Sequence, residues 1–330
     1  MDYVGLKDTD MKVSRLSFGT WSLSGSKNWG PNDEKESMDV INLAIDLGIN
    51  FIDTAAKYND GVAEQIVGKA IKNRRSEVIL GTKVHTALLG YDDVLKECEG
   101  SLERLGTDYL DLYQIHWPSR TIPADETMRA FEKLKSDGKI RAIGICNSGA
   151  GAIASFAEHN VVTNQLPYSL IWRQIETGVI PAARRAGMLV WAYCPLAQGL
   201  LTGKFRTVED VPLPRRETRF YSGAWKQGLH NDTGFEKEIF AFLPRLQALA
   251  DKAGVGMATL ALQYLKTNPD VGSVLIGARN GDQLRENLKM FEAAVPAAIM
   301  DEVRALSDEL KPKMGTNPDL WQDKDGGRFF

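Results

Sequence analysis

Short apolar runs alternate along the chain with longer segments in which apolar side chains recur every three or four residues. The run at 51–55 is followed by one such amphipathic segment, and the same order of run, loop and amphipathic segment recurs through most of the sequence. Short β-branched runs are typical of buried strands, whereas a 3.6-residue period is typical of helices. We therefore predict eight strands, at 16–21, 51–55, 78–83, 109–116, 139–146, 161–166, 188–194 and 273–278.

The segments between these runs carry the helical pattern. In 33–47, Met38, Ile41, Ala44 and Ile45 fall on one face, as expected of a helix that covers a sheet. The predicted helices cover 33–47, 61–72, 92–105, 123–137, 149–158, part of 173–186, 236–252, 256–267 and a segment that starts at 280.

Strict alternation of strands and helices predicts a parallel sheet, and eight units favour a closed (β/α)8 TIM barrel over an open sheet. The 330 residues exceed the usual size of one domain, but barrels of about 250 residues accept long insertions, so we predict a single barrel domain over 1–330. Residues 3–13 read as a hairpin that turns at 8–10 and plugs the barrel floor.

Three insertions and the C-terminal tail interrupt the regular pattern. The insertions lie at 22–31, 117–122 and 205–234, and the tail covers 311–330. Each insertion follows a strand. Because the carboxyl ends of parallel barrel strands share one rim, we expect extended rim loops at the functional end of the barrel.

Composition limits the classes of partner. The chain has 43% hydrophobic residues and a net charge of −3 without a basic patch, which favours small-molecule partners over nucleic acid. No run of about 18 apolar residues predicts a membrane span, and residues 1–5 lack a signal-peptide pattern. We expect a cytoplasmic protein with no membrane association and no extension before Leu6, and the oligomeric state stays open.

Four residues with complementary chemistry fall at or just after three predicted strand ends: Asp53, Tyr58, Lys83 and His116. In a barrel these positions open on one rim. Each residue alone has an ordinary structural explanation, such as a helix cap for Asp53 or a solvated strand end for Lys83. Their occurrence together predicts a proton-donor site.

The proposed roles follow from the side-chain chemistry. A free phenol titrates near ~10, and an adjacent ammonium is expected to lower that pKa. Lys83 would tune Tyr58, Asp53 would keep the ammonium charged and oriented, and Tyr58 would donate a proton to a carbonyl oxygen that His116 orients.

Several motifs follow one another along the chain: Asp53-Thr54-Ala55 with Tyr58, Gly81-Thr82-Lys83, Gln114-Ile115-His116-Trp117-Pro118, Tyr193-Cys194-Pro195-Leu196-Ala197, Gly199-Leu200-Leu201-Thr202-Gly203-Lys204 and Gly277-Ala278-Arg279. Together they resemble the signatures of the aldo-keto reductase superfamily, over about 16–287. Their residues are similar to those of the bacterial and potassium-channel β-subunit branches.

None of the four rim residues can carry a hydride, so a reductase of this kind needs a cofactor that does. The resemblance implies that this cofactor is NADP(H). No Rossmann fingerprint is present, and the segment from Gly199 to Lys204 lacks the spacing and the Ser or Thr of a P-loop. The implied cofactor residues are Thr20, Trp21, Asp53, Asn147, Ser148, Gln165, Tyr193, Cys194, Pro195, Leu196, Ala197, Gly199, Leu200, Lys204, Gly277, Arg279, Gln283, Glu286 and Asn287.

Within that set, Tyr193 resembles the aromatic that stacks on the nicotinamide, although a buried core aromatic is the alternative. Arg279, Gln283 and Asn287 follow the last strand at four-residue spacing, so one face of a helix or its entry presents all three. The resemblance assigns this region to the adenosine and its 2′-phosphate.

Substrate walls in the family come from rim loops, and here those loops are rich in tryptophan. The expected substrate residues are Tyr58, His116, Trp29 and Trp117, and the tail, with Trp321, is expected to fold over the rim. Trp172 and Trp225 are further candidates for the wall, although loop tryptophans can equally pack the loops themselves.

Three functions are compared. The leading one is NADPH-dependent reduction of aldehydes or ketones, with oxidation of a sugar or alcohol as its reverse. The second is a nucleotide-sensing regulatory subunit, since channel β-subunits share the barrel and tetrad. A metal-dependent hydrolase is disfavoured because the four histidines are scattered without an H-x-H pair, and no metal is expected.

Overall fold

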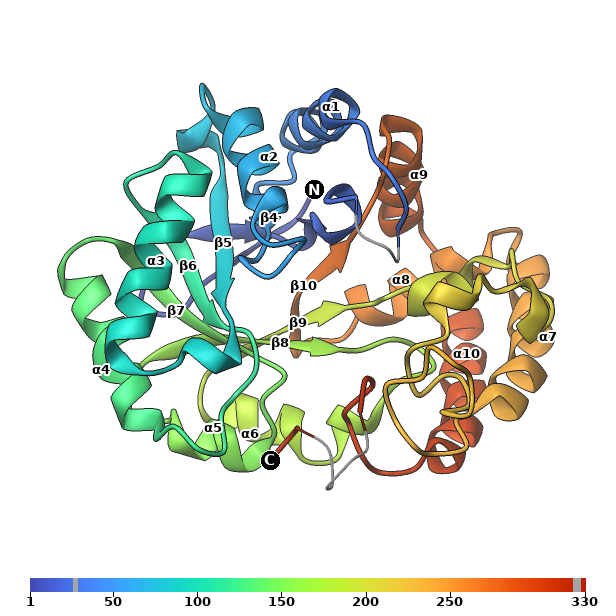
Figure 1. The fold of residues 1–330 in the computed structure, drawn as a ribbon. Helices are drawn as coiled ribbons and strands as arrows, with labels where there is room; N and C mark the ends of the chain where they lie inside the picture. The colour runs from blue at the N-terminus through green and yellow to red at the C-terminus, as the bar shows by residue number, and fades with distance from the viewer. Residues whose placement is uncertain (26–28, 323–327) are drawn as a thin grey trace.

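The structure is a computed structural model that describes residues 1–25, 29–322 and 328–330. In this part of the chain, eight parallel strands close into one barrel surrounded by helices (Figure 1), in the order β10-β3-β4-β5-β6-β7-β8-β9. The predicted TIM barrel is confirmed. The predicted loop 22–31 and the tail 311–330 each lie partly outside the described residues.

The strand boundaries agree with the prediction to within a few residues. The barrel strands are β3 (Leu16–Gly19), β4 (Phe51–Asp53), β5 (Ile79–Val84), β6 (Leu110–Ile115), β7 (Ile140–Cys146), β8 (Val161–Pro167), β9 (Leu189–Tyr193) and β10 (Val271–Ile276).

The helices lie outside the barrel and differ from the prediction mainly in two places. Helix α5 is shorter than predicted, and Pro296 separates a last helix, α10, that the sequence pattern did not reveal. Among the described residues, none of the helices combines the length and apolarity that a bilayer crossing requires. The bounds are α1 (Glu34–Asp46), α2 (Val62–Ile71), α3 (Tyr91–Leu105), α4 (Ala124–Ser136), α5 (Ala150–Ser155), α6 (Val179–Arg185), α7 (Glu236–Ala253), α8 (Met257–Lys266), α9 (Gly281–Glu292) and α10 (Ala297–Leu310).

The N-terminal hairpin closes the floor of the barrel, as predicted. Strands β1 (Tyr3–Gly5) and β2 (Lys12–Ser14) pair in antiparallel register. Leu6, Met11 and Val13 of the hairpin are buried in one cluster with inward-facing side chains of the barrel strands. The hairpin therefore covers the amino-terminal end of the barrel, opposite the carboxyl rim.

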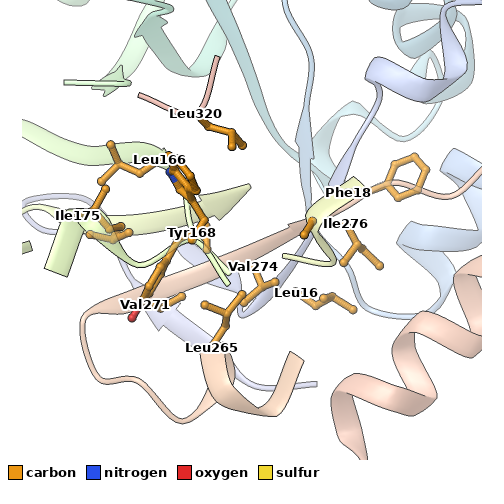
Figure 2. Close-up of a cluster of buried hydrophobic side chains, with 14 of the residues drawn as sticks. Leu16, Phe18, Leu166, Tyr168, Ile175, Leu265, Val271, Val274, Ile276 and Leu320 are labelled. Carbon is orange, nitrogen blue, oxygen red and sulfur yellow. The ribbon is translucent and has the colours of Figure 1, made fainter. Parts of the chain in front are cut away.

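Alternation along each strand separates an inner from an outer core. In β4, Phe51 belongs to the inner cluster and Ile52 to the outer one, so Asp53 points inward again. Gly81 makes room for this packing, because a Cβ atom there would lie 2.5 Å from Cζ of Phe51. Figure 2 shows part of the outer layer, where Leu16 and Val274 pack with neighbouring apolar residues.

The pairing register of neighbouring strands determines how close to the carboxyl rim each polar side chain lies. Asp53 is paired with Gly81 of β5, and Lys83, two residues further, is paired with Gln114 of β6. Residues two positions apart on a strand point to the same face, so Lys83 points inward as position 81 does. Asp53, Lys83 and Gln114 are thus brought together above the inner core, at the rim.

Candidate active site

The four residues predicted to form a proton-donor site do converge at the carboxyl rim. The Lys83 ammonium donates to Asp53 Oδ2 at 2.7 Å, to the Thr54 carbonyl oxygen at 2.7 Å and to the Tyr58 hydroxyl at 3.3 Å. The Tyr58 and His116 rings lie edge to face, with centroids 5.8 Å apart. All three donors of the ammonium therefore have acceptors inside the site.

Burial explains why this arrangement needs the ion pair. The Lys83 side chain is fully buried and Asp53 is 2% exposed, and an unpaired charge at such depth is strongly unfavourable. Burial is the largest single influence and would lower the pKa of Lys83, but Asp53 together with the neighbouring Tyr58 and Cys146 outweighs burial and raises that pKa above its usual value. Lys83 is consequently a permanent cation.

Two glutamine side chains orient the carboxylate of this pair. Asp53 Oδ1 accepts from Gln165 Nε2 at 3.0 Å and from Gln114 Nε2 at 3.3 Å. Gln114 was quoted in a motif but not expected as a site residue. Its inward position on β6, level with Lys83, is the signal that would have identified it.

The Tyr58 phenol differs from the expectation of a lowered pKa. Burial raises the pKa of Tyr58 to about 12, although Lys83 acts to lower it. Desolvation of the phenolate outweighs the single ammonium at 3.3 Å, which Asp53 already partly neutralises. Tyr58 is therefore a protonated donor at neutral pH, and the ammonium reduces the cost of ionising it.

His116 is a neutral imidazole beside this donor. Burial, together with the nearby Lys83, holds its pKa well below the usual value. Its Nδ1 atom is buried and has no hydrogen-bond partner among the described residues. A neutral ring with a free nitrogen suits a hydrogen bond to a ligand oxygen.

A cavity of about 960 Å³ extends from this cluster across the rim. Tyr58, His116, Trp29 and Trp117, the four expected substrate residues, line it. Expected cofactor residues that also line it are Thr20, Trp21, Asp53, Asn147, Gln165, Tyr193, Cys194, Pro195, Leu196, Gly199, Lys204, Gly277, Arg279, Gln283, Glu286 and Asn287.

Three expected cofactor residues lie behind that lining. Ser148 is fully buried and its hydroxyl donates to the Cys146 carbonyl oxygen at 3.1 Å, while Ala197 and Leu200 are fully buried apolar residues. In the structure these side chains support the turn after β7 and the turn after β9. Whether their backbone contacts a cofactor stays a prediction.

The turn after β9 has a backbone shaped for close approach. Cys194, Ala197 and Gln198 have positive φ angles, of 55°, 47° and 55°, which non-glycine residues rarely adopt outside functional or tightly constrained turns. Gly199 follows at φ 101°, and a Cβ atom there would lie 2.6 Å from Cε of Lys204. The missing side chain lets Lys204 lie across the turn.

Positive charge gathers along the cavity beyond this turn. Lys204 and Arg279 were expected, whereas Arg215, from the long segment after β9, was not. Burial and the neighbouring cations lower the pKa of Lys204 and that of Arg215. The Arg215 guanidinium carbon lies 5.1 Å from the Trp29 ring centroid, so two loops meet above the cavity.

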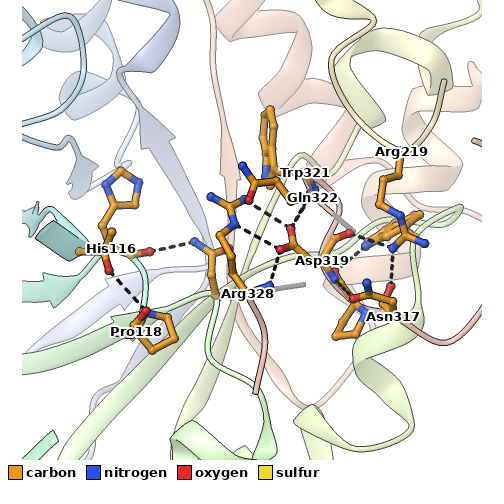
Figure 3. A network of polar contacts seen from close by, with 12 residues as sticks. His116, Pro118, Arg219, Asn317, Asp319, Trp321, Gln322 and Arg328 are labelled. Carbon is orange, nitrogen blue, oxygen red and sulfur yellow. Dashed lines mark hydrogen bonds and ion pairs between the residues drawn. The ribbon is translucent and has the colours of Figure 1, made fainter. Parts of the chain in front are cut away.

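The tail folds over the rim at the other end of the cavity, as expected. Trp321, Gln322 and Arg328 line it. Trp321 Nε1 donates to the Tyr193 hydroxyl at 3.0 Å, and that hydroxyl donates to Asn147 Oδ1 at 2.7 Å. Figure 3 shows the polar network of the tail around Asp319.

Two tryptophans suggested for the substrate wall do not reach it. Trp172 is 1% exposed, and its Nε1 donates to the Pro318 carbonyl oxygen at 3.1 Å. Trp225 Nε1 donates to Glu236 Oε1 at 2.5 Å. Neither lines the cavity. Trp225 instead braces the end of the long segment after β9, and Trp172 holds the tail while its ring packs on Phe220 of that segment. This is the structural alternative considered for loop tryptophans.

The rim cluster and the cavity into which it opens are those of an oxidoreductase built on a (β/α)8 barrel. The chain belongs to the aldo/keto reductase family: a sequence model of the Aldo/keto reductase family matches residues 15–308.

Individual relatives extend over nearly the whole chain. It is 36% identical to aldo-keto reductase YhdN of Bacillus subtilis, with 86% of this chain and 87% of the relative covered. It is 32% identical to the NADH-specific methylglyoxal reductase of Escherichia coli, with 94% and 100% covered. A probable voltage-gated potassium channel subunit beta of Arabidopsis thaliana is 29% identical, with 95% and 98% covered.

Solved structures share the fold over the same length. The glycerol dehydrogenase of Gluconobacter oxydans superposes with a TM-score of 0.80 at 30% identity, with 96% of this chain and 97% of that chain covered. An aldo/keto reductase of Klebsiella pneumoniae in complex with NADP and acetate superposes with a TM-score of 0.72 at 28% identity, with 93% and 95% covered.

Proposed function

We propose that the protein is an NADPH-dependent reductase of aldehydes or ketones in which Tyr58 donates the proton. The observation that carries this proposal is the contact of the Tyr58 hydroxyl with the buried Lys83 ammonium at 3.3 Å, on the wall of a cavity that His116 also lines. The pair stabilises the charge that the phenol acquires as its proton leaves.

The cavity fits a ligand that both donates and accepts hydrogen bonds. Five buried polar atoms on its wall have no partner among the described residues, and each such atom is unfavourable by about 1–3 kcal/mol until a ligand or water satisfies it. They are Ser22 Oγ, Trp29 Nε1, His116 Nδ1, Gln198 Oε1 and Arg279 Nε.

NADP(H) meets that requirement, and the Klebsiella relative was solved with it. The bound cofactor supplies the hydride. Lys204, Arg215 and Arg279 would hold its phosphates, because cations along a partly enclosed groove suit a polyanion. Tyr193, Asn147 and Gln165 would hold the nicotinamide end, since they line the cavity beside Asp53.

Each residue of the tetrad then has a defined task. His116, neutral and without a partner at Nδ1 among the described residues, donates a ring N–H to the carbonyl oxygen of the substrate and so orients it. The Tyr58 hydroxyl gives its proton to that oxygen as negative charge develops, and Lys83 stabilises the phenolate. Asp53 keeps Lys83 charged and directed at Tyr58.

Two alternatives rest on particular relatives. The glycerol dehydrogenase favours the oxidative direction, in which Tyr58 would accept a proton. The plant potassium channel subunit favours a regulatory barrel that binds the nucleotide without metabolic turnover.

The test is consumption of NADPH with a panel of glyceraldehyde, methylglyoxal, aldoses and aryl aldehydes. The proposal expects stoichiometric loss of NADPH with at least one aldehyde. Tight NADPH binding without turnover of any of them would favour the regulatory alternative, and turnover only from alcohols with NADP⁺ would favour the dehydrogenase.

A further inference from the structure

Arg328 places a cation on the cavity wall next to the catalytic histidine. It lines the same cavity as Tyr58 and His116. Its guanidinium carbon lies 3.4 Å from the centroid of the Trp117 ring, and Trp117 directly follows His116 in the chain. The stacking holds the guanidinium plane against one wall of the substrate end.

Asp319 fixes this arginine from the tail side (Figure 3). Asp319 is fully buried, and its carboxylate accepts from the backbone amides of Trp321, Gln322 and Arg328 at 2.9, 3.1 and 2.9 Å. Longer contacts of 3.3 and 3.4 Å run from Nε and Nη2 of Arg328 to the same carboxylate. The three amide contacts position the carboxylate, which in turn positions the guanidinium.

The contact with Asp319 compensates the positive charge of Arg328 only partly. Its side chain is 35% exposed whereas Asp319 is 0% exposed, so the cation faces the cavity and the carboxylate faces the protein. In the part of the chain that the structure describes, its remaining nitrogen Nη1 makes no hydrogen bond. A guanidinium with an open edge remains for a ligand.

Among the described residues, the other charged groups on the wall leave this end of the cavity positive. Lys57, next to Tyr58 in the chain, also lines the cavity. Its ammonium lies 3.5 Å from Oδ1 of Asp60, and both of these side chains are well exposed. Among the acids, Asp53 is bound to Lys83, and Glu217 is 9% exposed and engaged within the protein. Glu286 lies on α9, at the end that would hold adenosine.

We propose that the preferred substrates are aldehydes or ketones that carry a carboxylate, and that Arg328 binds this carboxylate while Tyr58 and His116 engage the carbonyl. This proposal rests on the reductase function proposed above. The planar guanidinium matches a carboxylate in charge and in its two parallel oxygens. One partly compensated arginine suits a monoanion better than a phosphate dianion. Arg328 is thus a specificity-determining residue.

The experiment compares a matched pair of substrates, 4-carboxybenzaldehyde and its methyl ester, with NADPH at saturation. In the wild-type protein we expect kcat/KM for the carboxylate to exceed that for the ester. Loss of a charge-assisted contact should lower this ratio by about ten- to a hundredfold in Arg328→Gln. Arg328→Lys, which keeps the charge, should retain part of the ratio.

A matched control separates this effect from a general loss of positive charge. Arg304 on α10 is 43% exposed on its side chain and does not line the cavity, so Arg304→Gln should leave the ratio at its wild-type value. Succinic semialdehyde against butanal repeats the comparison with a more flexible chain.

The possible failures are distinguishable. Reduction of neither aldehyde would remove the reductase function. Reduction of both with equal kcat/KM, or an Arg328→Gln variant that slows both substrates by the same factor, would overturn the carboxylate proposal and leave the reductase function intact.

Discussion

Trp321, in the C-terminal tail, donates its indole hydrogen to the hydroxyl of Tyr193 at the end of β9, at 3.0 Å. The tail is thereby tied to the wall that is expected to hold the nicotinamide. Leu320, next to it, is fully buried in the outer core, which anchors the tail at this point. Described residues of the tail, Trp321, Gln322 and Arg328, consequently form part of the cavity wall.

Replacing Trp321 with Phe should change the KM ranking of aldehydes by severalfold and change the Kd for NADPH much less. The ring remains while one hydrogen bond, of about 0.5–1.5 kcal/mol, is lost. Tyr193 keeps its contact with Asn147 at 2.7 Å. Steady-state kinetics on the aldehyde panel and fluorescence titration of NADPH provide the two readings.

Trp225→Phe is the control for that experiment, because this indole contacts Glu236 and does not line the cavity. An unchanged KM ranking in Trp321→Phe would show that the tail only packs against the rim.

Arg279→Ala should raise the Kd for NADPH by about ten- to a hundredfold, since a charge-assisted contact to the 2′-phosphate contributes roughly 1.5–3 kcal/mol. The Kd for NADH should stay nearly constant. The guanidinium also donates to the Pro31 carbonyl oxygen at 2.6 Å, so a structural role is the competing explanation.

Fluorescence titration with both nucleotides separates the two roles. Equal weakening of NADH and NADPH binding would assign Arg279 to loop packing. Arg285→Ala, an exposed position on α9, the helix that follows Arg279, does not line the cavity and should alter neither Kd. The comparison is informative here because one relative is NADH-specific.

The pKa of Tyr58, raised to about 12 by burial against the opposing effect of Lys83, sets the pH dependence. The phenol stays protonated at neutral pH, so carbonyl reduction should show no loss from Tyr58 ionisation up to about pH 9. Alcohol oxidation, which needs the phenolate as base, should rise with pH over the same range.

The profiles of kcat/KM against pH in both directions test this. Removing the ammonium in Lys83→Met raises the phenol pKa further, so the rise in oxidation should move to more alkaline pH. An alkaline loss of reduction with an apparent pKa near about 8 would contradict the assignment.

Lys83→Met should also destabilise the fold, by about 3–5 kcal/mol, because it leaves Asp53 buried without its cation. The double variant Lys83→Met with Asp53→Asn removes both charges and should recover part of that loss. Urea unfolding of the wild type, both single variants and the double variant gives the coupling energy. A double variant whose loss equals the sum of the two single losses would show that the pair makes no net interaction.

The barrel and the tetrad were predictable because both depend on local order along strands. The alternation of Phe51, Ile52 and Asp53 along the strand already places the carboxylate inward. Lys83 follows Gly81, the partner of Asp53, by two residues and therefore also points inward. Strand ends share one rim in a parallel barrel, so their convergence follows from the fold class.

The remaining features depend on contacts between segments far apart in the sequence. Arg215 and Arg328 reach the cavity from irregular segments. Such segments have no periodic pattern of apolar residues from which their contacts with the barrel could be predicted. The pKa of Tyr58 depends on how completely packing removes water, which residue types alone do not reveal. Trp172 and Trp225 illustrate the opposite case, since rim loops also need apolar side chains for their own packing.

The measurement that tests the account most directly is single-turnover reduction of an aldehyde by Tyr58→Phe, with Tyr91→Phe on α3 as the control. Tyr58→Phe should bind NADPH as the wild type does and transfer hydride about 10²–10⁴-fold more slowly, because the proton donor is gone. A Tyr58→Phe protein that reduces the aldehyde within a few-fold of the wild-type rate would contradict the role of Tyr58 as proton donor.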